Sequence, residues 1–188
     1  SEFFEKNKHF LGFDTLQRSL ITAVKEAVDN SLDACEEVRI HPKISVTIEK
    51  VKGDRIKLTC RDNGPGIPRD SIANVFGKFL LGSRFHAIRQ TRGQQGIGIT
   101  GVVMYSQLTT GSKTHVISKT QSDTGAVKVD IGLDTRKNRA IKTNEKREPW
   151  MENGEEISRG LEIQTVMKAK YQRGRQSVYQ YLRMTSIV

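Results

Sequence analysis

Residues 24–34, VKEAVDNSLDA, constrain the fold more than any other stretch, because their apolar and polar positions repeat with the period of an α-helix. At 100° per residue, one side of this helix is mainly apolar and the other is polar. The mainly apolar side carries Leu20, Val24, Ala27, Val28, Ser31 and Cys35. The polar side carries Glu26, Asn30, Asp33 and Glu37. We therefore predict a long helix with one face buried.

The ends of this helix can also be read from the sequence. Asp14 or Thr15 offers an N-cap, and Pro42 prevents continuation, so the helix is expected to run to about Val38. Ahead of it, five large apolar residues crowd a short segment, which must pack on its own domain or on a second subunit. These residues are Phe3, Phe4, Phe10, Leu11 and Phe13.

Glu26 and Asn30 are the residues of the polar side that suggest chemistry. They are four residues apart, so their side chains lie one helical turn from each other. A carboxylate beside a neutral oxygen ligand suits a site that holds Mg²⁺, a phosphate and an attacking water. Taken alone, however, the pair fits a solvated helix face better.

The remaining pattern predicts one α+β domain. Alternating residues in 44–48 and 56–60, on either side of Gly53-Asp54, predict an antiparallel hairpin. A short helix is expected from residue 72, a second one from about Ile99 and a last one around residues 178–185. Further strands are expected at 107–110, 114–119, 126–131 and 161–167, and residues 138–158 are expected to form a meander at the edge.

Composition bounds the class of protein and its partners. The 188 residues carry a net charge of +10, which suits polyphosphate or nucleic acid as a partner, although a basic solvated surface is the alternative. No apolar run approaches the ~20 residues of a membrane span, and the N-terminal residues do not resemble a secretory signal. Cys35 and Cys60 lack metal-ligand spacing and are expected to be buried, reduced thiols. We therefore expect a cytoplasmic protein with no membrane partner.

The motif DNGPGIP, at residues 62–68, follows the second predicted strand and suggests a base-binding pocket. A carboxylate at Asp62 can accept a hydrogen bond from the 6-amino group of adenine, whereas guanine presents an oxygen there and would be rejected. Gly64 and Gly66 let the backbone approach a flat base. An ordinary Asn-Gly turn between a strand and a helix is the alternative.

A second glycine array, GQQGIGITG at residues 93–101, precedes a predicted helix. Backbone N–H groups freed by glycine, together with a helix N-terminus, form an anion site that suits a triphosphate. The array is neither a P-loop nor a Rossmann fingerprint. Residues 77–101 contain six glycines and no acid, and they are expected to form a lid that closes over a ligand.

Three boxes in this order resemble those of the GHKL ATPases: ExxxN at Glu26 and Asn30, DxGxG from Asp62, and GxxGxG from Gly93. The intervening segments EFFEKNKHFLGFD, FGKFLLGSRFH, TRGQQGIGITGVVMYSQLTTG and KYQRGRQSVYQYL are similar to the B subunits of archaeal-type, type IIB DNA topoisomerases. The similarity covers nearly the whole chain.

The resemblance implies a two-layer α+β sandwich, in which helices cover one face of a mixed, mostly antiparallel sheet. It implies ATP and Mg²⁺ as cofactors, Glu26 as the general base and Asn30 as the metal ligand. The nucleotide-binding residues that it implies are Asn30, Asp62, Gly64, Gly66, Gly82, Ser83, Gly93, Gln94, Gln95, Gly96, Ile97 and Gly98. Two features depart from the family pattern: Gly160-Leu161 replaces a Gly-Thr pair, and a transducer domain is absent from this chain.

The resemblance also implies an organisation and partners. Residues 1–13 would form a strap that crosses to a second subunit, and residues 14–188 the ATP-binding domain, with its lid at about 77–101. The partners would be a separate DNA-cleaving A subunit, double-stranded DNA and a second copy bound in the presence of ATP, in the cytoplasm at the nucleoid. The alternatives are a GHKL clamp with a DNA-repair or chaperone role and a basic DNA-binding module without enzymatic activity.

Overall fold

The computed structural model describes residues 9, 11–77, 98–134, 136–137 and 139–186. The described chain contains four α-helices, a short 3-10 helix and eight strands. In order they are α2 (Leu16–Glu37), β1 (Ile44–Lys52), β2 (Arg55–Asp62), η1 (Arg69–Ser71), α3 (Ile72–Gly77), α4 (Gly98–Thr110), β3 (Thr114–Lys119), β4 (Ala126–Asp134), β5 (Arg139–Glu148), β6 (Met151–Glu152), β7 (Glu155–Glu156), β8 (Gly160–Lys168) and α5 (Val178–Thr185).

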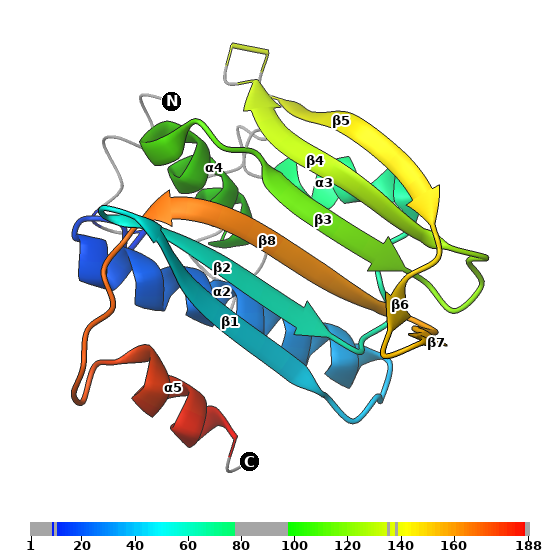
Figure 1. Ribbon diagram of the computed structural model, residues 1–188, viewed down its shortest axis with the longest axis horizontal. Helices are drawn as coiled ribbons and strands as arrows, with labels where there is room; N and C mark the ends of the chain where they lie inside the picture. Colours follow the sequence, from blue (N-terminus) through cyan, green and yellow to red (C-terminus); the bar gives the residue numbers. More distant parts are fainter. Residues whose placement is uncertain (1–8, 10, 78–97, 135, 138, 187–188) are drawn as a thin grey trace, which may run out of the picture.

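Six strands form one sheet in the order β1-β2-β8-β3-β4-β5, and β6 and β7 form a separate hairpin. Every neighbouring pair in the large sheet is antiparallel. Helices α2, α3 and α4 lie on one face of this sheet (Figure 1). The expected two-layer α+β sandwich is therefore confirmed, and its described strands are antiparallel throughout rather than mixed.

The buried face of β2 explains why an acidic residue reaches the interior. Burial alternates along the strand, with Ile56, Leu58, Cys60 and Asp62 turned toward the helices. Because successive side chains of a strand point to opposite faces, Asp62 continues the buried series of its apolar neighbours. The strand thus positions a carboxylate at the end of the core, beneath α2.

Helix α2 begins and ends close to the predicted positions. The side chain of Thr15 caps it by accepting a hydrogen bond from the backbone N–H of Arg18, and the helix ends at Glu37. Just ahead of it, Phe13 is buried and stacks on Tyr105 of α4 with ring centroids 4.8 Å apart. The last residues of the expected strap therefore pack on their own domain, whereas residues 1–8 and 10 lie outside the described part.

One predicted strand is wrong. Residues 107–110 belong to α4, which continues to Thr110. The hydroxyls of Thr109 and Thr110 donate hydrogen bonds to the carbonyls of Tyr105 and Ser106, four residues earlier, so these β-branched residues are accommodated in the helix. The meander expected at 138–158 corresponds to the edge strand β5 and the β6–β7 hairpin.

Helix α5 forms where the sequence predicted it and packs against α2. Ser177 caps its N-terminus by accepting a hydrogen bond from Gln180. Tyr181 donates a hydrogen bond of 2.6 Å to the Asp29 carboxylate, and the Lys25 ammonium lies 5.8 Å from the centre of the Tyr181 ring. Helix α5 is therefore held against α2 by a hydrogen bond and a cation–π contact.

Candidate nucleotide-binding site

A cavity of about 240 Å³ opens between α2, the loop after β2, α3, the first turn of α4 and β8. Its walls are largely apolar. Asp62 is the one carboxylate among the described residues that line it. The lining residues used in the argument below are Asn30, Ser31, Asp62, Gly66, Ile99 and Leu161. An apolar cleft with few convergent polar groups is the usual form of a small-molecule site.

Asp62 lies in this cavity with only 6% of its surface exposed. One carboxylate oxygen, Oδ1, accepts hydrogen bonds from the backbone N–H groups of Gly64 (2.9 Å) and Leu161 (3.2 Å). The other, Oδ2, accepts a hydrogen bond of 2.7 Å from the Ser31 hydroxyl. Burial raises the pKa of Asp62 although these hydrogen bonds lower it in part. The three donors fix the orientation of the carboxylate.

Two positions near Asp62 require glycine because another backbone segment approaches them closely. Gly66 has φ = +71°, and a Cβ at this position would lie 2.2 Å from the backbone oxygen of Lys119. Gly160 has φ = +146°, and its Cβ would lie 2.3 Å from the Asp62 carbonyl oxygen. A larger residue at either position would push the loop or β8 away from the cavity.

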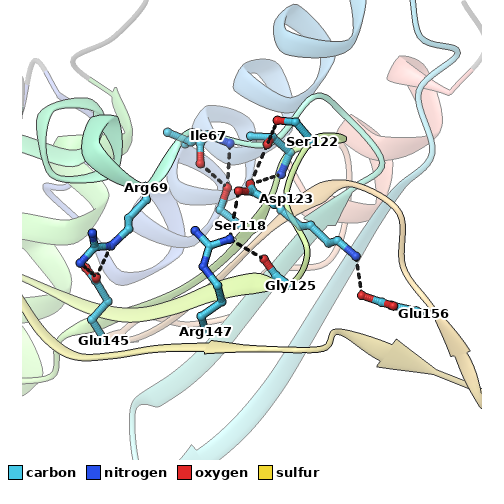
Figure 2. A network of polar contacts seen from close by, with 11 residues as sticks. Ile67, Arg69, Ser118, Ser122, Asp123, Gly125, Glu145, Arg147 and Glu156 are labelled. Carbon is cyan, nitrogen blue, oxygen red and sulfur yellow. Dashed lines mark hydrogen bonds and ion pairs between the residues drawn. The ribbon is translucent and has the colours of Figure 1, made fainter.

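A polar network holds the same loop against the sheet (Figure 2). The Ser118 hydroxyl of β3 accepts a hydrogen bond of 2.7 Å from the Ile67 N–H and donates one of 2.8 Å to the Ile67 carbonyl. Two residues further on, Arg69 pairs with Glu145 of β5. Arg147, also on β5, pairs with Asp123 in the β3–β4 turn. The loop that forms one wall of the cavity is thus attached to β3 and, through Arg69, to the edge strand β5.

We expect replacement of Ser118 by Ala to lower the free energy of unfolding by about 1 kcal/mol, because two backbone groups of Ile67 lose their partner. The affinity for the nucleotide that the sequence leads us to expect should fall several-fold, because the loop then samples positions that narrow or open the cavity. Thermal melts and nucleotide titration measure both effects. Ser122, an exposed serine in the adjacent turn, provides the control, and equal losses in Ser122→Ala would contradict the assignment.

Glu26 and Asn30 lie one turn apart on α2, and Glu26 lies beside Gly98, the first residue of α4. Glu26 is partly buried, and a Cβ on Gly98 would lie 1.6 Å from its Oε2 atom. Burial raises the pKa of Glu26, and the neighbouring Asp29 carboxylate raises it further. Asn30 lines the cavity, and within the described part of the chain its amide has no hydrogen-bond partner. A carboxylate that could act as a base and an amide oxygen that could bind a cation therefore lie one helical turn apart, the amide oxygen at the cavity.

Part of the expected set cannot be placed. Gly82, Ser83, Gly93, Gln94, Gln95, Gly96 and Ile97 lie outside the described residues. The structure thus brings together Asn30, Asp62 and Gly66 around the cavity and places Gly98 against Glu26. Gly64 does not line the cavity but donates its backbone N–H to Asp62. Among the described residues no group of three or more His, Cys, Asp or Glu side chains could hold a metal by itself. A cation here would need oxygen ligands from a bound phosphate, which is how Mg²⁺ is commonly held.

Two serines that support the site were not identified from the sequence. Ser31 was assigned only to the buried side of α2, and Ser118 only to a strand. A signal for Ser31 was available, because a serine on a buried helix face needs a hydrogen-bond partner and an acidic motif follows. Nothing in the sequence pairs Ser118 with Ile67. Leu161, at the departure from the Gly-Thr pair, lines the cavity and holds Asp62 through its backbone N–H.

Residues 15–137 match the family described as histidine kinase-, DNA gyrase B- and HSP90-like ATPases. The chain belongs to this family of ATPases. Over its whole length it is 52% identical to the B subunit of type 2 DNA topoisomerase 6 from Archaeoglobus fulgidus, 49% to that from Methanosarcina acetivorans and 45% to that from Thermococcus gammatolerans. The chain spans 30–32% of the length of these relatives. Within its described part, no helix is long and apolar enough to cross a membrane.

Proposed function

We propose that this chain is the ATP-binding and ATP-hydrolysing domain of the B subunit in a type IIB DNA topoisomerase. The observation that carries the proposal is the Asp62 carboxylate, which three hydrogen-bond donors orient in an otherwise largely apolar cavity. Membership of the ATPase family supports nucleotide binding, and the names of the relatives support the topoisomerase assignment.

Adenine would fill the cavity with its amino group directed at Asp62. Oδ1 already accepts two backbone N–H groups, so the amino group would donate to Oδ2, which holds only the Ser31 hydroxyl. Guanine would place an oxygen opposite this carboxylate, and two acceptors facing each other in a dry pocket repel. The site would therefore prefer ATP to GTP.

Hydrolysis would use Glu26 and Asn30. Glu26 would accept a proton from the water that attacks the γ-phosphorus, and its raised pKa makes it a stronger base than an exposed glutamate. The Asn30 amide oxygen would coordinate Mg²⁺, a fit supported by its free side chain at the edge of the cavity. When bound, the ion would neutralise charge on the phosphates. Gly82, Ser83 and the glycine box at residues 93–98 would bind the phosphates.

The larger cycle would be a gate for DNA strand passage. ATP would order a lid at about 77–101, and residues 1–13 would act as a strap across a second copy of the chain. The complete assembly would also contain a transducer domain beyond residues 14–188, a DNA-cleaving A subunit and double-stranded DNA. It would act in the cytoplasm at the nucleoid. Equilibrium titration with Mg·ATP and Mg·GTP tests the first step of this cycle, and a chain that binds neither would contradict the proposed function.

We expect a non-hydrolysable ATP analogue to shift the chain from monomer toward dimer, and ADP to do so poorly. A ligand shifts an equilibrium only by its differential affinity for the two states, so the γ-phosphate must contact the closed form. Sedimentation of the apo, ADP-bound and analogue-bound chain measures this. Deletion of residues 1–8 should abolish the shift but leave nucleotide affinity unchanged. The deletion should end before residues 11–13, because Phe13 is part of the core.

A chain that sediments identically in all three states, at saturating nucleotide, would contradict ATP-driven closure in this domain. Retained dimerisation after removal of residues 1–8 would contradict the role of the strap alone.

A further inference from the structure

Basic residues gather at the end of the sheet that lies away from Asp62. The antiparallel order brings the β1–β2 turn, the C-terminal end of β8 and the segment after β8 to this end (Figure 1). β2 runs from Arg55 at this end to Asp62 at the other, a span of about 23 Å at 3.3 Å per residue. We define the basic end by five residues that lie on these segments: Lys50, Lys52, Arg55, Lys168 and Lys170.

Three of these bases are direct cross-strand neighbours. Lys52 of β1 is the partner of Arg55 on β2, and Arg55 is the partner of Lys168 on β8. Like charges directly opposite each other destabilise a sheet. Among the described residues the one acid that pairs with this row is Asp54, half exposed and 3.9 Å from the Lys168 ammonium. The row is therefore unfavourable for the sheet, and Asp54 offsets only part of its charge.

A groove opens at the same end of the sheet, on the face that the helices cover, whereas the row Lys52-Arg55-Lys168 lies on the opposite face. It has a volume of about 690 Å³ and is lined in part by Leu16, Ile48, Lys50, Lys170 and Tyr171. Aliphatic side chains thus lie beside two ammonium groups, the Asp54 carboxylate and an exposed tyrosine, whose hydroxyl can donate to an anion. None of the residues that line this groove lines the nucleotide cavity. The basic end is a surface separate from that cavity.

We propose that the basic end binds the phosphodiester backbone of double-stranded DNA without reading its sequence. The argument is charge complementarity: a row of long basic side chains across three strands matches a polymer with one negative charge per about 1.7 Å of helix axis. The proposal rests on the proposed function, from which the choice of DNA as the polyanion comes. Bound phosphates would also offset the repulsion between Lys52, Arg55 and Lys168.

The test replaces Lys52, Arg55 and Lys168 together by Gln and measures binding of a short fluorescent DNA duplex over a series of salt concentrations. A contact with a phosphate contributes about 0.9 to the slope of log affinity against log salt, so the slope should fall by about 2.7. Binding at a fixed low salt concentration should weaken at least tenfold. The same variant should melt at the temperature of the parent or above it, because like-charge repulsion is removed.

The matched control replaces Lys43, Lys146 and Arg183 by Gln, which removes the same charge from exposed positions outside the segments that define the basic end. This control should keep the salt slope of the parent to within one contact. Equal slopes for the parent and the basic-end variant, or an equal loss in the control, would overturn the proposal. ATP affinity is measured in all three chains: its absence would contradict the proposed function, while the DNA result decides the basic end separately.

Discussion

Replacement of Glu26 by Gln should slow ATP hydrolysis by about 10²–10⁴-fold and leave ATP affinity close to that of the parent. The amide keeps the size of the side chain but cannot accept the proton of the attacking water. Because burial raises the pKa of Glu26, the parent should lose activity as the pH falls through a range above that of an ordinary glutamate. The residual rate of the variant should not show this acid limb.

Single-turnover hydrolysis with the protein in excess over ATP measures the chemical step, and a binding titration on the same preparation measures affinity. Glu37→Gln is the matched control, since Glu37 is an exposed glutamate at the last position of the same helix. It should hydrolyse ATP at the parental rate. Parental hydrolysis by Glu26→Gln would show that the base lies elsewhere and would leave Asn30 as the one residue of α2 in the proposed mechanism.

Gly98 explains why this base depends on a second helix. Its missing Cβ lets the first turn of α4 approach the Glu26 carboxylate, so α4 excludes water from one side of it. This approach is a physical reason for the burial that raises the pKa of Glu26, and the Asp29 carboxylate of α2 raises that pKa further. The last glycine of the GxxGxG box thus contacts the proposed base, in addition to any role toward phosphate.

The periodic parts of the chain were predictable because local pattern and tertiary packing agree in them. The α2 boundaries follow from Thr15 and the apolar repeat, and the β1–β2 hairpin follows from strict alternation around Gly53-Asp54. Asp62 could be placed in a pocket for the same reason, since its strand has a buried face. The resemblance to the GHKL ATPases added the order of the boxes and the nature of the ligand.

Other features depend on contacts between segments that are distant in the sequence. Ser118 and Ile67 are 51 residues apart, and Asp62 and Leu161 are 99 apart, so no local pattern links them. Residues 107–110 were predicted as a strand, and their β-branched threonines do favour one, but packing of α4 against β8 stabilises a helix there. The register that places Lys52, Arg55 and Lys168 in one row could likewise come only from the sheet order.

Asp62→Asn separates nucleotide recognition from stability. The backbone N–H groups of Gly64 and Leu161 would hold the amide oxygen at the position of Oδ1, so the NH₂ group would take the position of Oδ2. There the Ser31 hydroxyl can rotate to accept a hydrogen bond. The amino group of adenine, however, would meet a donor instead of an acceptor. Recognition should therefore be lost while the internal hydrogen bonds survive.

We expect ATP affinity to fall by about 1.5–3 kcal/mol, the scale of a hydrogen bond to a charged group. The preference for ATP over GTP should shrink too, because the amide can donate to the guanine oxygen. Burial raises the pKa of Asp62, so the folded chain binds this proton more tightly than the unfolded chain, and ionising Asp62 at neutral pH costs stability. The neutral variant, free of that cost, should melt at the parental temperature or above.

Competitive titration of both nucleotides and thermal melts of the apo chain measure these effects. Asp54→Asn makes the same change at an exposed turn on the other end of β2 and should alter neither nucleotide preference nor ATP affinity. A retained preference for ATP in Asp62→Asn would assign base recognition to other groups of the cavity. A marked loss of melting temperature together with affinity would instead mean that Asp62 is a structural residue whose charge stabilises the fold. The amide keeps the hydrogen bonds, so their loss could not explain such a result.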